Sequence, residues 1–150
     1  MNYYLMKSEP GVYSIDDFKR DKTTHWDGVR NYQARNFMME MKKGDEILFY
    51  HSNAKEIGIV GTAKVSKESY PDFTAWDKKD DHYDPKIKDG DPRWQMVDIR
   101  FVKKFSKIIT LDELKKHKQL KGMFILRKGN RLSVTHVTKE EFEHVLKLGT

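Results

Sequence analysis

Short apolar runs, separated by polar and glycine- or proline-rich stretches, dominate the chain and predict β-strands. Runs of this length, rich in aromatic and β-branched residues and bounded by turn residues, are typical of strands. The predicted strands cover residues 3–7, 46–51, 58–65, 94–102 and 131–134, and residues 123–126 are expected to be extended. Gly58 and Gly61 predict a bulge or bend in the strand that contains them.

Capping residues followed by apolar positions at three- and four-residue spacing predict four helices. Ser14 precedes two acids, whose charges favour a helix N-terminus. Asn31 is a candidate N-cap for a helix that runs to about residue 42, with Gly44 as its stop. A capping box at 110–113 predicts a helix that runs to about residue 118. A second capping box at 138–141 predicts the start of the last helix.

Long, variable connections between these strands exclude a repeating β-α-β pattern. The stretch 70–92 is rich in Asp, Lys, Gly and Pro, and it is either a solvated loop held by its aromatic residues or a wall of a binding site. No repeat or low-complexity linker divides the 150 residues. We therefore predict one α+β domain over residues 1–150, with a mostly antiparallel sheet curled into a barrel and flanked by helices.

Composition favours a polyanionic partner. The 29 Lys and Arg residues exceed the 23 Asp and Glu residues, for a net charge of +6 with neutral histidines. Many small lysine-rich proteins carry such an excess for solubility alone, but three Trp, seven Tyr and eight Phe place these charges on a packed domain. The N-terminus does not resemble a signal peptide, and no apolar run approaches the ~18 residues of a membrane helix. We expect a cytoplasmic protein, nuclear in a eukaryote, with no membrane partner.

The residue types offer little for catalysis or cofactor binding. The absence of Cys excludes a disulfide framework, a zinc ribbon and a cysteine nucleophile. The densest group of possible metal ligands, residues 80–84, lacks the spacing of a helical or EF-hand site. Neither a nucleophile elbow nor a phosphate-binding loop is present. We expect no metal, no cofactor and no enzymatic activity; the enzyme alternative would use His51 as a general base.

Four segments carry the groups that base recognition needs: an aromatic face, hydrogen-bonding groups and cations. These segments are residues 7–10, 26–31, 49–53 and 127–134. Taken alone, Trp26 is more often a core residue, and residues 51–53 more often form an ordinary polar turn. The residue types by themselves therefore leave two interpretations open: these structural roles, or a shared pocket for a base.

The same segments resemble the EVE domain family. The resemblance rests on residues 5–10, 49–53, 58–61, 70–72 and 131–134, and above all on the eleven residues Trp26–Asn36. It implies a PUA-like fold, a β-barrel flanked by helices, and kinship with YTH domains, which hold a methylated base in an aromatic cage. It also implies binding of DNA or RNA that carries a modified base, such as methylated or hydroxymethylated cytosine.

The resemblance further implies roles for individual residues, with Trp26 as the wall on which a flipped base stacks. The implied base pocket consists of Lys7, Ser8, Trp26, Asn31, Tyr50, His51, Ser52, Asn53 and Ser133. Arg30, Arg127 and Arg131 are expected at phosphates. The family motifs do not fix the loop over residues 76–92; if this loop supplies a second aromatic wall, Phe73 or Trp76 is the candidate. The chain departs from the family pattern at His136, where relatives often have proline. The alternative function is general RNA binding, on tRNA or rRNA, through a basic face, and the oligomeric state is left open.

Overall fold

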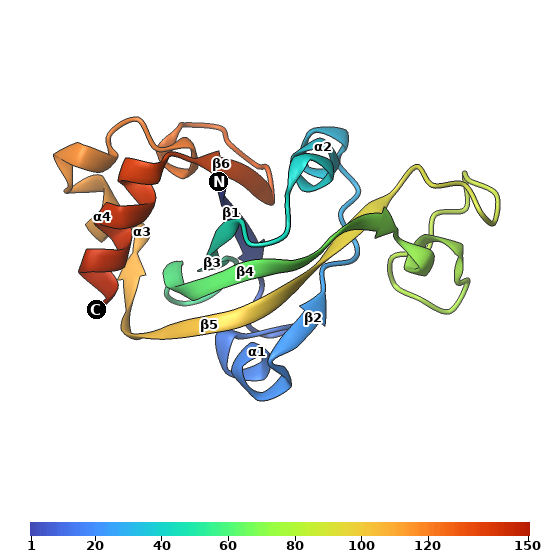
Figure 1. Ribbon diagram of the computed structural model, residues 1–150, viewed down its shortest axis with the longest axis horizontal. Coiled ribbons are helices and arrows are strands. Elements are labelled where there is room, and N and C mark those ends of the chain that lie inside the picture. Colours follow the sequence, from blue (N-terminus) through green and yellow to red (C-terminus); the bar gives the residue numbers. More distant parts are fainter.

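The computed structural model describes residues 1–150 as a single six-stranded sheet with helices on both faces (Figure 1). The strands are β1 (Tyr3–Ser8), β2 (Thr23–His25), β3 (Glu46–His51), β4 (Gly58–Pro71), β5 (Gln95–Thr110) and β6 (Val134–Val137). The helices are α1 (Ile15–Asp21), α2 (Tyr32–Glu40), α3 (Leu111–Lys115) and α4 (Lys139–Gly149), with 3-10 turns η1 (Phe73–Trp76), η2 (Lys118–Leu120) and η3 (Phe124–Leu126). None of the helices has the length and apolar character needed to traverse a bilayer.

The strand order is β2-β5-β4-β3-β1-β6, and only the β1–β3 pair is parallel. The predicted α+β class and mostly antiparallel sheet are therefore confirmed. The predicted closure into a barrel is wrong, because β2 pairs only with β5 and β6 pairs only with β1, which leaves both as edges. Helix α2 packs against both β5 and β6, so the packing of a helix takes the place of the hydrogen bonds that would close the sheet.

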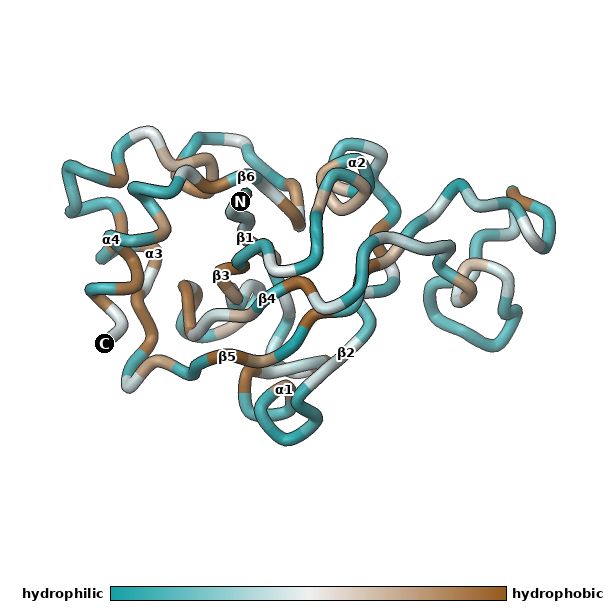
Figure 2. Tube along the Cα trace, in the orientation of Figure 1, coloured by the Kyte–Doolittle hydropathy of each residue, from teal (hydrophilic) through white to brown (hydrophobic).

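Both faces of the sheet are buried, in two separate hydrophobic clusters. Along β1, Tyr4 and Met6 enter the cluster that includes residues of α1 and α2, whereas Leu5 enters the cluster that includes residues of α3 and α4. Successive side chains of a strand point to opposite faces, so a sheet covered on both sides needs apolar residues at every position. Figure 2 shows apolar residues concentrated along the central strands. This burial explains why the strands read as continuous apolar runs.

The long strands β4 and β5 extend beyond their predicted ends and form a twisted ribbon with several register shifts. One shift falls between Ile59 and Gly61, which confirms the predicted bulge. Strand β2 was not predicted, because its sequence Thr-Thr-His has no apolar pattern. The loop between β4 and β5 projects from one end of the molecule (Figure 1).

The segment before β6 lies outside the sheet, contrary to prediction. Residues 123–126 form η3 instead of an extended segment, and the strand predicted for 131–134 begins only at Val134. The Asn130 side chain explains the difference, because it donates to the Phe124 carbonyl at 3.1 Å and accepts from the Leu132 N–H at 3.0 Å. Such local bonds compete with strand pairing. Residues 127–133 therefore form a surface loop.

The predicted capping residues begin the helices. Ser14 and Thr138 form complete capping boxes, and Thr110 accepts from the Glu113 N–H. Asn31 caps α2 by accepting from the Ala34 N–H at 3.0 Å. This cap fixes the start of α2 directly after the loop that contains Trp26.

Candidate functional site

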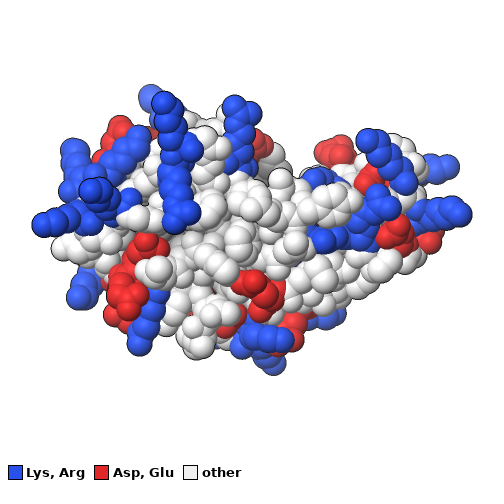
Figure 3. Space-filling view, turned by 90° about the horizontal axis from the view of Figure 1, so that it is seen from above, with Lys and Arg blue, Asp and Glu red and all other residues white.

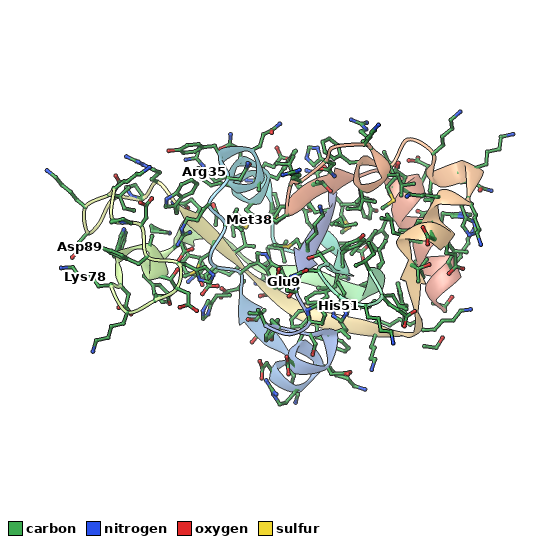
Figure 4. All side chains as sticks on the ribbon, turned by 180° about the vertical axis from the view of Figure 1, so that it is seen from behind. Glu9, Arg35, Met38, His51, Lys78 and Asp89 are labelled. Atoms are coloured by element: carbon green, nitrogen blue, oxygen red, sulfur yellow. The ribbon has the colours of Figure 1, made fainter.

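A cavity of about 460 Å³, here called the Trp26 cavity, opens between loops on one side of the molecule. One loop follows β1, one joins β2 to α2 and one precedes β6, and His82 from the β4–β5 loop completes the wall. The lining residues are Lys7, Ser8, Glu9, Val12, Tyr13, Thr24, His25, Trp26, Asp27, Gly28, Val29, Arg30, His82 and Ser133. In Figure 4, Glu9 marks this region near the middle of the molecule. The structure thus brings Lys7, Ser8, Trp26, Arg30 and Ser133 together.

Trp26 belongs to both the core and the cavity. It is 9% exposed, and its ring meets Phe49 edge-to-face at 5.6 Å between ring centroids. The backbone N–H of Trp26 donates to the Val97 carbonyl at 2.7 Å, which anchors this loop to β5. A ring held in this way loses no freedom when a ligand arrives, and preorganisation of this kind favours binding.

Hydrogen bonds join the end of β1, which bears Lys7 and Ser8, to the loops that bear Tyr13 and Ser133. The Lys7 N–H donates to the Ser133 carbonyl at 2.9 Å, which continues the β1–β6 pairing. The Ser8 hydroxyl donates to the Tyr13 carbonyl, so its oxygen remains able to accept a further hydrogen bond. Two of the cavity walls are therefore fixed to each other.

A buried carboxylate, Asp72, holds the Trp26 loop against the β4–β5 loop. Its side chain is fully buried and accepts from the Gly28 N–H at 2.8 Å, from Arg30 Nη1 at 2.9 Å and from the N–H and hydroxyl of Thr74. Burial alone raises the pKa of a carboxyl, but here the bonds from Thr74, Gly28 and Arg30 outweigh burial and hold the pKa of Asp72 below its usual value. Asp72 is therefore a positioning residue for the cavity wall.

Arg30 is committed to the same assembly. Its Nε and Nη2 donate to the His82 carbonyl at 3.1 and 2.7 Å. Nη1 donates to the Val29 carbonyl and to Asp72, and Nη2 also donates to the Thr74 hydroxyl at 3.3 Å. A guanidinium has five N–H groups, and all five are engaged within the protein. Arg30 therefore positions the cavity wall in this structure, and its expected contact with a phosphate stays a prediction.

The His82 side chain reaches the cavity because Gly28 has no side chain. Gly28 has a φ of 79°, and a Cβ placed on it would lie 2.5 Å from His82 Nε2. The imidazole thus packs directly on the backbone of the Trp26 loop. A glycine is required here both for its backbone conformation and for this close approach.

Two oppositely charged side chains, Lys7 and Asp27, are half-buried in the cavity. Burial lowers the pKa of the Lys7 ammonium, and no carboxylate offsets that effect. Burial also raises the pKa of the Asp27 carboxyl, and the charge of Asp72 adds to the rise, while His25 and His82 oppose it. Partly desolvated charges without full protein partners are ready to interact with a polar ligand.

A second, shallower cavity of about 390 Å³ adjoins the start of α2, and we call it the Arg131 groove. It is lined by Asn31, Gln33, Phe124, Arg127, Lys128, Gly129, Asn130, Arg131 and Leu132. Of the expected site residues it contains Asn31, Arg127 and Arg131. No acidic residue lines it, and Arg127 lies over the Phe124 ring at 4.6 Å. Figure 3 shows basic side chains gathered toward the two ends of the upper face, with uncharged atoms between them.

The expected residues Tyr50, His51, Ser52 and Asn53 line neither cavity. Tyr50 is buried in the cluster near α4. His51 Nε2 accepts from the Ile15 N–H at 3.1 Å, so this nitrogen is not free to act as a general base. The Ser52 N–H donates to the Ser8 carbonyl at 2.9 Å, and Asn53 donates to Glu9 at 3.0 Å. These residues support the loop after β1 from outside the cavity.

The two candidates for a second aromatic wall also lie outside the cavity lining. Phe73 is 51% exposed, with its ring 5.8 Å from that of His25. Trp76 Nε1 donates to the Asp91 carbonyl at 3.1 Å, which holds the β4–β5 loop to itself. The loop does form a wall of the cavity, but it does so through His82.

Sequence reasoning did not select His25, Asp27, Gly28 and His82 as site residues. Asp27 and Gly28 lie within the Trp26–Asn36 block, so their proximity to Trp26 was a usable signal. His82 had no local signal, because its position depends on the contact with Gly28. No three or more acidic or histidine side chains gather where they could hold a metal ion.

Comparisons with known proteins match nearly the whole chain. The family model for the EVE domain matches residues 2–148. Mouse thymocyte nuclear protein 1 is 48% identical over 166 aligned positions, which span 98% of this chain and 73% of the mouse protein. A structure of human thymocyte nuclear protein 1 in complex with DNA containing 5-methylcytosine has a TM-score of 0.91 at 48% identity, covering 99% of this chain and 98% of the other. A Pseudomonas syringae protein has a TM-score of 0.95 at 45% identity, covering 99% of both chains.

Proposed function

Because this chain belongs to the EVE domain family, we propose that it binds nucleic acid and holds one flipped base, modified as in 5-methylcytosine, in the Trp26 cavity. The observation that carries the proposal is a preformed cavity of about 460 Å³ with an aromatic wall and two half-buried charges. Its volume falls within the range of roughly 300–1,000 Å³ that is usual for small-ligand pockets. The human relative solved with 5-methylcytosine DNA supports a nucleic acid as the partner.

The energetics of flipping require a second source of affinity. Removing a base from a duplex costs a few kcal/mol. Stacking on one aromatic ring returns about 1–3 kcal/mol, so Trp26 roughly balances that cost. The net affinity must then come from contacts to the phosphate backbone, which dominate nucleic-acid binding in general.

The Arg131 groove is suited to those backbone contacts. The segments 26–33 and 127–133 both run from the Trp26 cavity into the groove, so the two hollows adjoin each other. Arg127, Lys128 and Arg131 have no carboxylate partner there, which leaves their charges available to phosphates. In this proposal a strand whose base enters the cavity continues along the groove.

The proposal is tested with two duplexes that differ only in cytosine or 5-methylcytosine at one position. Fluorescence anisotropy should show about fourfold tighter binding to the 5-methylcytosine duplex. This factor corresponds to the ~0.8 kcal/mol that burial of one methyl group contributes. Trp26→Ala removes the stacking wall and should weaken binding between about fivefold and about 150-fold. Trp76→Phe, which alters a tryptophan outside the cavity, should leave binding unchanged.

Trp26→Ala also empties a core position, at a cost of about 3–5 kcal/mol, so thermal unfolding is measured in parallel. Trp26→Phe retains an aromatic ring and should give intermediate affinity in a folded protein. Equal affinity for both duplexes, unaffected in either Trp26 variant, would contradict the proposal. That result would instead favour general RNA binding through the cations of the Arg131 groove.

A further inference from the structure

Two histidines flank the Asp27 carboxylate at the rim of the Trp26 cavity. His25 Nε2 lies 3.4 Å from Asp27 Oδ2, and His82 Nδ1 lies 4.0 Å from Asp27 Oδ1. The side chains of His25 and His82 are 49% and 43% exposed, whereas that of Asp27 is 27% exposed. Solvent and ligands therefore reach the imidazoles more readily than the carboxylate between them.

The remaining charged groups around these three side chains are also defined. Asp80 Oδ1 lies 3.2 Å from His82 Nδ1, and Arg30 donates to the His82 carbonyl. Asp98 pairs with His25 across the β2–β5 ladder and accepts from the Tyr70 hydroxyl. Lys7 and Glu9 line the same cavity, and Asp72 lies behind the loop. The rim thus carries several carboxylates close to the two histidines.

A nucleotide carries a phosphate next to its sugar, so a base held in this cavity would place a phosphate near the residues of its opening. Phosphate and the Asp27 carboxylate repel each other, and the repulsion is stronger where the groups are partly shielded from water. Histidine is the side-chain type used most often for charge changes between pH 5 and 8, and this rim carries two of them. With protonated imidazoles, the rim balances Asp27 and offers N–H donors to phosphate oxygens.

We propose that His25, Asp27 and His82 form a proton-gated phosphate contact, at which the imidazoles take up protons when a nucleotide enters the cavity. This inference rests on the proposed function and adds the residues that meet the phosphate of the bound nucleotide. In the complex a phosphate joins Asp27 near the imidazoles, so the complex favours their protonated forms more than the free protein does. Binding and protonation then strengthen each other reciprocally.

The direction of the effect follows from that linkage. If the complex holds more protons than the free protein, affinity increases as the pH falls. For the wild type we expect roughly tenfold tighter binding at about pH 5.5 than at about pH 8, at constant ionic strength. The probe is the 5-methylcytosine duplex, and the measurement is the dissociation constant by fluorescence anisotropy.

The double variant His25→Gln/His82→Gln removes both protonation sites. We expect its dissociation constant to change less than about twofold over the same range, because glutamine cannot take up a proton. The matched control is His117→Gln/His144→Gln, which changes the residue before η2 and a residue of α4. Their ring nitrogens Nδ1 and Nε2 lie 3.2 Å apart, and neither residue lines either cavity. This control should keep the wild-type pH dependence.

The variant Asp27→Asn tests the same contact through a gain of affinity instead of a loss. Without the carboxylate, phosphate no longer needs protonated imidazoles, so binding near pH 8 should become several-fold tighter and less dependent on pH. Asp89→Asn is the charge-matched control, because Asp89 lies at the outer end of the β4–β5 loop in Figure 4. Asp89→Asn should bind as the wild type does.

The inference is overturned if the double histidine variant keeps the full pH dependence, or if Asp27→Asn binds no more tightly than Asp89→Asn near pH 8. Trp26 dependence and preference for 5-methylcytosine are measured at one pH and test the proposed function separately. If both hold while the histidine variants have no effect, only the proton-gated contact is lost. If both fail, the nucleic acid does not occupy the cavity and both proposals fall.

Discussion

The Trp26 cavity and the Arg131 groove adjoin each other but are built in opposite ways. Acidic, basic and histidine side chains all line the cavity, and hydrogen bonds to Asp72 and from Arg30 fix its walls. The groove contains three basic side chains, no acid, and a backbone organised mainly by one asparagine. One region is rigid and chemically mixed, and the other is uniformly positive.

This difference separates selectivity from affinity. Selection among bases requires groups held in fixed positions, because a misplaced donor or acceptor discriminates poorly. Attraction to a phosphate backbone needs only charge and tolerates mobile side chains. Variants of the first region should therefore change which nucleic acid is bound, and variants of the second should change how strongly any nucleic acid is bound.

The largest effect is expected from Asp72→Ala, which breaks the assembly behind the cavity. Removing one partner of a buried ion pair costs about 3–5 kcal/mol, and here it leaves Arg30 without its carboxylate partner. Chemical denaturation should show this loss, and the preference for 5-methylcytosine should vanish while salt-dependent binding through the groove remains. Asp91→Ala removes a partly exposed carboxylate of the same loop, paired with Arg93 at 3.5 Å, and should cost no more than about 1 kcal/mol.

Asp72 also predicts a pH dependence of stability. Its pKa is lower in the folded protein than its ordinary value of 3.8, so the unfolded chain binds more protons between the two values. The stabilisation is thus fully present above the ordinary value and is lost as the pH falls through the lowered one. Unfolding midpoints of the wild type should fall on acidification through that window. Those of Asp72→Ala should change less, and equal slopes for both proteins would contradict the assignment.

The sequence predicted the local features of this molecule and missed those that depend on distant contacts. Ser14, Asn31 and Thr138 cap helices as predicted, because a cap needs only neighbours along the chain. The open sheet was missed because the packing of α2 against β5 and β6 depends on the tertiary fold. The placement of Arg30 and His82 was missed for the same reason, since Arg30 depends on the buried Asp72 and His82 depends on its contacts with Gly28 and Arg30.

A smaller effect is expected in the Arg131 groove. Arg131→Ala should lower the slope of log affinity against log salt by roughly one, the loss of a single phosphate contact. The loss of affinity should be the same for the cytosine and 5-methylcytosine duplexes, and thermal stability should stay within about 0.5 kcal/mol. Lys78→Ala, at the outer end of the β4–β5 loop in Figure 4, is the control and should keep the wild-type slope. A change in base preference in Arg131→Ala would break the division between the two regions.

The smallest effect is expected from Phe73→Ala, which decides how the β4–β5 loop contributes to the cavity. Phe73 is one of two aromatic residues that the sequence offered for a second wall, but its ring is 51% exposed and lies outside the lining. His82 occupies the cavity wall instead, packed on Gly28. We therefore expect Phe73→Ala to change affinity for the 5-methylcytosine duplex less than about twofold and stability less than about 0.5 kcal/mol. A loss of affinity as large as that of Trp26→Ala would show that the loop moves when nucleic acid binds and brings Phe73 onto the base. The rigid character assigned to the cavity would then apply to the free protein alone.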